Sequence, residues 1–269
     1  MIDVFKRNNV TISGQGEKVI LFAHGFGCDQ NTWKYIKNAF TTDYKTVFFD
    51  YVGAGRSDLD FYDPQKYNSL DGYATDVIEI CLALRSDNII FIGHSVSCMI
   101  GVLASIKNPG IFKKLILIGP SPCYINTEGY TGGFDQDIID SLFEVMEEDY
   151  IGWAQSLAPA IMGNQNDPEL GKELADSFCS IDPTIAKQFA RVTFLSDNRK
   201  DLPLVQVESL TIQCSVDTIA PLSVGEYVHQ HMPNNTLTVL DAYTHCPHMS
   251  YPEQTIAAIR NYLSENSIY

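Results

Sequence analysis

A serine stands where a buried apolar segment changes into a helical one. The run Ile89–Ile92 is β-branched and aromatic, Gly93-His94-Ser95-Val96-Ser97 follows it, and residues 98–104 are typical of a helix. A G-x-S-x-G corner between a strand and a helix holds its serine in a strained turn with the hydroxyl exposed. Ser97 replaces the last glycine here, and a serine that merely caps the helix is the alternative. We predict that Ser95 is a nucleophile.

A serine hydroxyl needs a base to activate it, and the base needs an acid to orient it. In α/β-hydrolases the acid and then the histidine follow the serine, each on a loop after a strand. Two apolar runs satisfy this order, because residues 210–214 precede Asp217 and residues 236–240 precede His245. Asp241 is the alternative acid, although it lies too near the end of its own strand to face the histidine. We predict Asp217 as the acid.

His248 is a second candidate base, since it lies in the same His-Cys-Pro-His segment as His245. We favour His245, which follows the strand directly, whereas His248 lies close to the start of the C-terminal helix. A metal site at this cluster is disfavoured, because Pro247 interrupts it and an acidic partner is missing. His229 and His231 are two positions apart on an expected helix and face different ways. We therefore expect no metal and no cofactor.

Acyl chemistry also needs hydrogen-bond donors for the oxyanion that develops in the transition state. The first apolar run, residues 19–23, ends in His24-Gly25-Phe26-Gly27. We assign the donors to the backbone N–H groups of Phe26 and Val96. A second glycine-rich segment, residues 50–58, contains Gly-x-Gly after a strand but lacks the third glycine and the helix of a dinucleotide site. We predict a tight loop there.

Short apolar runs alternate with helix-like segments along most of the chain, and continuous apolar runs are typical of strands buried on both faces. The alternation predicts a largely parallel sheet wrapped by helices, with residues 10–12 as an antiparallel edge. The expected strands are residues 19–23, 46–49, 88–92, 114–118, 210–214 and 236–240, and the expected helices are 69–84, 96–107, 223–231 and 252–266.

Residues 121–200 interrupt this alternation. The segment predicts four helices, at residues 135–148, 150–162, 168–180 and 183–195, separated by Gly, Asn and Pro. It carries 14 acidic and 5 basic residues, a net charge of −9 out of −15 for the whole chain. We predict one α/β core formed by residues 1–120 and 201–269, with residues 121–200 inserted as a helical cap.

Composition excludes several classes of protein. The formal charge of −15 argues against binding nucleic acid or an anionic membrane surface. The longest apolar runs fall well short of the roughly 18 residues of a membrane-spanning helix, and the first residues lack the apolar core of a secretion signal. Seven singly spaced cysteines do not form a disulfide framework. We expect a cytoplasmic protein.

Several motifs together resemble those of the RsbQ-like α/β-hydrolases, a group that includes a bacterial stress regulator and the plant strigolactone and karrikin receptors. The Ser97 variant of the serine corner is typical of this family. The motifs that carry the resemblance are residues 24–30 (HGFGCDQ), 50–58 (DYVGAGRSD), 93–97 (GHSVS), 119–124 (GPSPCY), 132–134 (GGF) and 245–250 (HCPHMS).

The resemblance implies an α/β-hydrolase fold with a helical cap and a Ser95–His245–Asp217 triad. It also implies an apolar pocket under the cap, lined by Phe26, Tyr124, Phe134, Leu142, Trp153, Leu157 and Phe194.

The implied activity is hydrolysis of a small hydrophobic ester or lactone. The implied role is that of a positive regulator in stress signalling, with a PAS-domain phosphatase as partner. A stand-alone metabolic carboxylesterase, a C–C bond hydrolase and a cofactor-free haloperoxidase share the triad and remain alternatives. A dehalogenase is excluded, because such enzymes carry Asp where this chain has Ser95.

Overall fold

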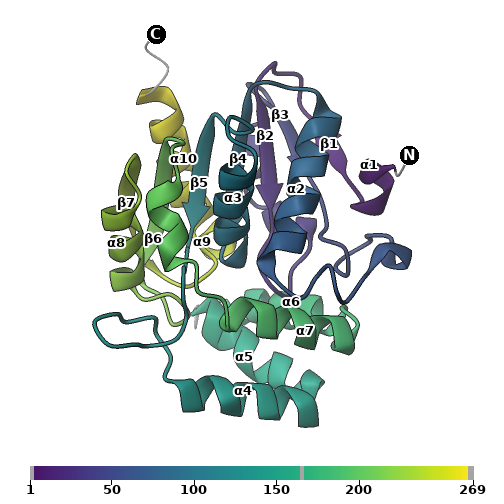
Figure 1. The fold of residues 1–269 in the computed structure, drawn as a ribbon, viewed down its shortest axis with the longest axis vertical. Coiled ribbons are helices and arrows are strands. Elements are labelled where there is room, and N and C mark those ends of the chain that lie inside the picture. The colour runs from purple at the N-terminus through teal and green to yellow at the C-terminus, as the bar shows by residue number, and fades with distance from the viewer. Residues whose placement is uncertain (1–2, 164–166, 266–269) are drawn as a thin grey trace.

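The computed structural model describes residues 3–163 and 167–265. Its centre is a seven-stranded sheet with the strand order β1-β3-β2-β4-β5-β6-β7 (Figure 1). Only β1 runs antiparallel, at the edge beside β3, so the predicted parallel sheet with an antiparallel edge strand is confirmed. The strands are β1 (Thr11–Ser13), β2 (Val19–Ala23), β3 (Lys45–Phe48), β4 (Ile89–His94), β5 (Lys114–Ile118), β6 (Ser209–Val216) and β7 (Asn235–Tyr243).

Helices cover both faces of this sheet, which explains why its strands are apolar along their whole length. On β2, Leu21 packs in the core formed with α2 (Leu70–Leu84) and α3 (Val96–Lys107). Its neighbour Phe22 points to the opposite face and packs in the core formed with α10 (Pro252–Glu265). Successive side chains of a strand alternate between faces, and here both faces are buried. Helix α8 (Leu222–His231) packs against β6 and β7, and the short α9 (Pro247–Ser250) packs against α10 and the segment Gln30–Trp33.

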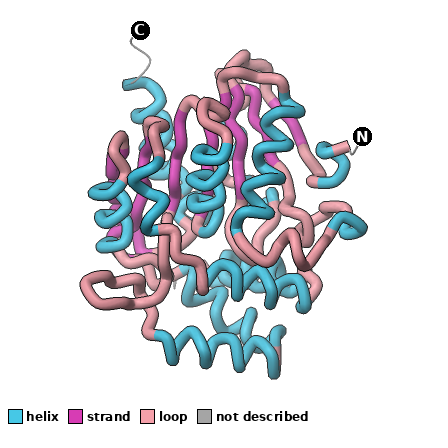
Figure 2. The backbone as a smooth tube through the Cα atoms, in the orientation of Figure 1, coloured by secondary structure: helices cyan, strands magenta, loops and turns pink. Residues whose placement is uncertain are grey.

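Four further helices lie together beyond the end of the sheet, between β5 and β6 in the sequence (Figures 1 and 2). Asp149, Asp167 and Asp182 accept backbone hydrogen bonds at the starts of three of them, and prolines follow the last two caps. Their apolar faces form a separate buried cluster. They are α4 (Gln136–Glu148), α5 (Tyr150–Met162), α6 (Pro168–Cys179) and α7 (Pro183–Phe194); we call them the cap helices.

The shortest helices were not predicted. Helix α1 (Val4–Arg7) is held by Arg7, whose guanidinium is 3% exposed and pairs with Asp76 at 3.1 Å and Glu79 at 2.6 Å on α2. Four short 3₁₀ helices cover Gln30–Trp33, Lys37–Ala39, Leu59–Phe61 and Arg199–Leu204. Among the described helices, none has the length and hydropathy to cross a membrane.

Candidate active site

Ser95 lies in a strained turn between β4 and α3. Its φ is +56°, in the left-handed region that a non-glycine residue seldom adopts. Close packing enforces the turn, because a Cβ at Gly93 would lie 2.8 Å from the backbone of Ser97. Ser97 is itself part of the corner: its hydroxyl donates to the carbonyl of His24 and bonds the Tyr51 hydroxyl at 2.8 Å. A serine at this position therefore ties the corner to the strand end at β2.

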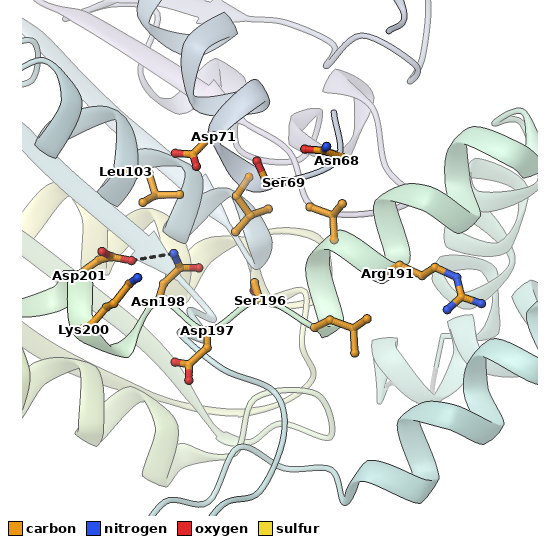
Figure 3. Close-up of a pocket in the computed structure, with 13 residues that line it drawn as sticks. Asn68, Ser69, Asp71, Leu103, Arg191, Ser196, Asp197, Asn198, Lys200 and Asp201 are labelled. Atoms are coloured by element: carbon orange, nitrogen blue, oxygen red, sulfur yellow. Dashed lines mark hydrogen bonds between the residues drawn. The ribbon is translucent and has the colours of Figure 1, made fainter. Parts of the chain in front are cut away.

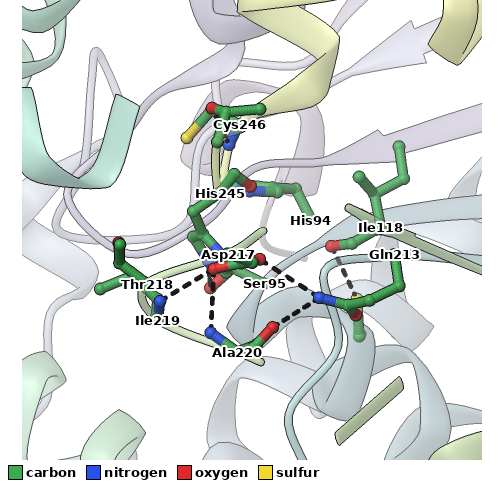
Figure 4. A network of polar contacts seen from close by, with 12 residues as sticks. His94, Ser95, Ile118, Gln213, Asp217, Thr218, Ile219, Ala220, His245 and Cys246 are labelled. Atoms are coloured by element: carbon green, nitrogen blue, oxygen red, sulfur yellow. Dashed lines mark hydrogen bonds and ion pairs between the residues drawn. The ribbon is translucent and has the colours of Figure 1, made fainter. Parts of the chain in front are cut away.

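His245 stands between Ser95 and Asp217. Its Nε2 is 2.9 Å from the Ser95 Oγ, and its Nδ1 is 2.8 Å and 3.0 Å from the two carboxylate oxygens of Asp217. The three side chains come from the carboxyl ends of β4, β6 and β7 and are all buried. The structure thus brings together the three residues that the sequence singled out for a nucleophile, a base and an acid (Figure 4).

The carboxylate of Asp217 is held by its own loop. The backbone N–H groups of Ile219 and Ala220 donate to Oδ1 at 2.8 Å and 2.9 Å. The Gln213 side-chain amide lies 3.3 Å from Oδ2 and donates to the Ala220 carbonyl at 2.6 Å (Figure 4). Asp241, the alternative acid, is exposed and lies outside this network.

The two backbone segments assigned to the oxyanion converge on Ser95. Val96 is the first residue of α3, where backbone N–H groups have no partner within the helix. The loop after β2 approaches from the other side, because a Cβ at Gly25 would lie 3.4 Å from the Cβ of Ser95. Phe26 follows in this loop and places its ring on the pocket wall.

A narrow pocket lies above Ser95 and His245, between the sheet and the cap helices. The space open to the centres of water-sized molecules is about 30 Å³, room for one or two waters. Four of the residues that the family resemblance assigned to the pocket line this cavity, namely Phe26, Tyr124, Leu157 and Phe194.

The structure does not bring the other three assigned residues, Phe134, Leu142 and Trp153, to the wall of this cavity. They form a layer behind the wall. The Trp153 ring packs edge-on against Phe26 with centroids 6.2 Å apart, and Phe134 packs against Phe194 at the same spacing. Leu142 packs into the cluster among the cap helices.

Sequence reasoning missed several pocket residues. Phe178 of α6 is the largest, and its position depends on Gly27, where a Cβ would lie 1.5 Å from the ring. Gly27 also has a φ of +75°, so two reasons require glycine there. Periodicity along α6 marks Phe178 as buried, but nothing in the sequence shows which core it faces. The remaining missed residues are Cys28, His94, Ile161, Leu174, Thr193, Ile219 and Cys246.

The chain is similar in sequence to a large family of known proteins. Residues 20–258 match the family described as "Alpha/beta hydrolase family". The chain belongs to the alpha/beta hydrolase family. It is 38% identical to "Karrikin insensitive 2 receptor CA" of Petunia hybrida over 97% of each chain. It is 37% identical to "Strigolactone esterase D14" of Arabidopsis thaliana, over 97% of this chain and 98% of that one.

Solved structures show the same fold. A hydrolase from Oleispira antarctica, olei00960, superposes with a TM-score of 0.96 and 42% identity, covering 98% of this chain and 97% of its own. The esterase EaEST from Exiguobacterium antarcticum superposes with a TM-score of 0.88 at 22% identity, over 95% and 94% of the two chains. The α/β-hydrolase fold predicted from the sequence is confirmed.

His248, the alternative base, is buried in this α/β-hydrolase and does not reach Ser95. Its Nε2 is 2.9 Å from the Thr32 hydroxyl and its ring lies 4.5 Å from that of Trp33. Burial, followed by the charge of His245, lowers the pKa of His248 to about 3. The neighbouring His94 donates from Nε2 to the backbone carbonyl of His245 at 2.9 Å, and burial holds its pKa well below the usual value. Both rings are neutral, with His94 packed beside His245 and His248 packed beside His94.

The cap helices bond directly to the loops that carry the triad. The Ile161 carbonyl, in the last turn of α5, accepts from the backbone N–H of His245 at 2.9 Å. The preceding carbonyl, of Ala160, accepts from the Thr218 hydroxyl at 3.1 Å. Carbonyls at the end of a helix lack hydrogen-bond partners within the helix. Here the Thr218 hydroxyl and the His245 N–H are the donors to two of these carbonyls. On α6, the Ser177 hydroxyl donates to the Gly27 carbonyl at 2.8 Å.

The predicted tight loop after β3 is present, and no helix begins at its glycines. Buried Asp50 organises it by accepting the backbone N–H groups of Gln30 and Arg56, each at 2.9 Å. His229 and His231 are exposed and bond Asn235 and the Tyr227 carbonyl separately. Over residues 3–163 and 167–265 no cluster of three or more His, Cys, Asp or Glu side chains could hold a metal.

A wider groove of about 510 Å³ lies away from the triad, where α7 meets α2, α3 and the segment after α7 (Figure 3). Its lining is largely polar and includes Asn198 and Asp201, which bond each other at 2.9 Å. It contains none of the triad residues, and we do not assign the chemistry to it.

Proposed function

We propose that this α/β-hydrolase cleaves small hydrophobic esters or lactones with Ser95 as the nucleophile. The observation that carries the proposal is the continuous chain from Ser95 Oγ through the His245 ring to Asp217, with contacts of 2.9 Å and 2.8 Å. A serine, an imidazole and a carboxylate in this order form the constellation that performs acyl transfer on several unrelated folds.

In the proposed reaction, the Ser95 hydroxyl attacks the carbonyl carbon while His245 Nε2 takes its proton. The carbonyl oxygen becomes an oxyanion, which the backbone N–H groups of Phe26 and Val96 stabilise. The tetrahedral intermediate collapses to an acyl-serine as His245 returns the proton to the leaving alcohol. Water then attacks the acyl group with the same histidine as base. Asp217 keeps the Nδ1 proton in place and stabilises the imidazolium.

The pocket supports a small, uncharged substrate. Among the described residues that line it, none is Asp, Glu, Lys or Arg, and aromatic and aliphatic side chains form most of the wall. A charged acyl group would lose its hydration there without gaining a partner. The open volume of about 30 Å³ also limits the occupant to a few heavy atoms unless side chains move.

The decisive experiment compares the wild type with Ser95→Ala on p-nitrophenyl acetate, with intact-mass analysis after treatment with a serine-directed sulfonyl fluoride. We expect turnover to fall at least about 10³-fold and the covalent adduct to disappear. His229→Gln, which changes an exposed histidine far from the pocket, should behave as the wild type. Wild-type rates in Ser95→Ala would remove Ser95 from the reaction.

We further propose that hydrolysis serves a regulatory output, as in the RsbQ-like group, with a PAS-domain phosphatase as partner. Relatives named as receptors, 38% identical over 97% of the chain, favour this role over that of a stand-alone carboxylesterase, C–C bond hydrolase or cofactor-free haloperoxidase. The acidic cap segment offers a surface for a protein partner. Affinity purification of the wild type from its native cell tests this role. The comparison is a variant whose cap carboxylates are changed to amides. Rapid turnover of common esters without any co-purifying phosphatase would contradict the regulatory role.

A further inference from the structure

A second cavity lies against the reaction pocket. Leu174 and Cys28 belong to the walls of both cavities, and they are only 2% and 3% exposed. The second cavity, which we call the outer cavity, offers about 260 Å³ to the centres of water-sized molecules, against about 30 Å³ in the reaction pocket. The space near Ser95 is thus separated from a much larger one by the side chains of Leu174 and Cys28.

The side chains of Leu174 and Cys28, which form the partition between the two cavities, can move at little energetic cost. Leu174 lies on α6, and a leucine can change rotamer without losing a polar contact. Cys28 lies two residues after Phe26, next to the loop assigned to the oxyanion. Its thiol is small and polarizable, and burial, followed by the charge of Asp29, raises its pKa to about 12. The partition is therefore uncharged, and it forms part of the wall of the pocket that contains Ser95.

The outer cavity differs from the reaction pocket in charge. Its lining includes the carboxylates of Asp29, Glu173 and Asp176 and no Lys or Arg side chain. Lys34 balances one of them, through a contact of 2.7 Å to Glu173. An excess of negative charge remains, which repels an anionic group and attracts a cationic one. The side chains of Met249 and Leu174 contribute apolar surface to the same cavity.

We propose that the reaction pocket continues past Leu174 into the outer cavity, and that Leu174 sets the length of the substrate chain that the enzyme accepts. The occupant is an elongated apolar chain, on either the acyl or the alcohol side of the ester, with an uncharged or cationic end. The inference rests on the proposed function, because it names the substrate class of the same site.

The preference of the enzyme for long or short esters tests whether Leu174 closes the reaction pocket off from the outer cavity. We expect Leu174→Ala to raise kcat/KM for p-nitrophenyl octanoate, or for octyl acetate, about 15-fold relative to the corresponding short ester, since about two more methylenes become buried. Leu174→Trp should shift the preference toward the short ester by a similar factor. Leu170→Ala is the matched control: it removes the same side chain one turn earlier on α6, at 7% exposure, and lines neither cavity. It should leave the length preference unchanged.

A binding experiment tests the same proposal without turnover. Thermal-shift titrations should show stabilisation by octyltrimethylammonium and little by octanoate, and Leu174→Trp should abolish the stabilisation. Asp176→Lys, at the exposed rim, should reduce the preference for the cation.

The outcomes separate the two proposals. Unchanged length preference in both Leu174 variants, with Ser95-dependent turnover of the short ester intact, would overturn the inference and leave the proposed function standing. Ester turnover that survives Ser95→Ala would overturn the proposed function, and the titrations would then decide the inference alone. Stabilisation by octanoate equal to that by octyltrimethylammonium would refute the assigned charge preference.

Discussion

His248 offers a quantitative test of the histidine cluster beneath the triad. The ring is buried against Trp33 and His94, with centroids 4.5 Å away in both cases, and the Thr32 hydroxyl is its polar partner. Burial comes first and the charge of His245 second in lowering its pKa to about 3. The unfolded chain binds a proton at this residue below about pH 6.5, whereas the folded chain does not until about pH 3.

The sign of the effect follows from this difference. His248 does not weaken the folded state above about pH 6.5, and the free energy of unfolding falls as the pH drops from there toward about 3. Between pH 6 and pH 5 the loss is about 1 kcal/mol from this residue alone. His248→Phe keeps a ring against Trp33 and His248→Gln keeps an acceptor for Thr32, and neither titrates. Between pH 6 and pH 5, both variants should therefore lose about 1 kcal/mol less stability than the wild type.

Urea denaturation followed by circular dichroism at pH 7, 6 and 5 gives the required free energies. The comparison uses the change with pH within each protein, so a constant destabilisation caused by repacking cancels. His229→Gln serves as the control for the loss of a histidine, because the His229 side chain is exposed and lies outside this cluster. If both His248 variants lose stability with pH as steeply as the wild type, the neutral buried histidine is refuted.

Three other changes test the site. Asp217→Asn preserves the shape of the acid but presents an amide to His245 Nδ1, and should lower kcat for an aryl ester about 10⁴-fold. Thr218→Val removes the donor to the Ala160 carbonyl, and we expect kcat to fall about threefold to tenfold; Thr218→Ser should restore the rate, which a purely steric role would not. Gly27→Ala places a Cβ 1.5 Å from the Phe178 ring at a φ of +75°, and should reduce the free energy of unfolding by about 3 kcal/mol in urea denaturation. Phe178→Ala in the same chain should recover part of that loss, and a Gly27→Ala protein as stable as the wild type would contradict the packing argument.

The sequence predicts most of the fold because burial on both faces leaves a strong pattern. Residues 19–23 and 114–118 coincide with β2 and β5 as the structure has them. Residues 96–107 and 150–162 coincide with α3 and α5. Short elements escape such reasoning, since α1 has four residues and depends on Arg7 reaching Asp76 on a distant helix. No local pattern encodes that contact.

The grouping of Ser95, His245 and Asp217 was predictable from the sequence for a different reason. In a parallel sheet the carboxyl ends of the strands meet at one edge, so residues just after β4, β6 and β7 must be neighbours. The pocket wall has no such constraint. Trp153 and Phe178 are both aromatic and both on cap helices, yet only Phe178 lines the cavity, and the Trp153 ring packs against it with centroids 5.5 Å apart. Position in the sequence predicts which residues meet at Ser95, whereas only tertiary packing decides which side chains line the pocket.

Under the proposed function, the contacts between cap and triad join ligand binding to chemistry. The open space above Ser95 is about 30 Å³, so any substrate larger than a few atoms must displace side chains of the wall, most of which come from α5, α6, α7 and the loop after β2. The last turn of α5 holds the backbone of His245 at 2.9 Å, and α6 holds the Gly27 carbonyl at 2.8 Å. A ligand that moves these helices therefore changes the positions of the base and of the oxyanion loop. By reciprocity, an acyl group on Ser95 that favours one cap position alters the surface that the cap presents to a partner. Turnover and signalling need not compete in such a protein, since the same contacts serve both.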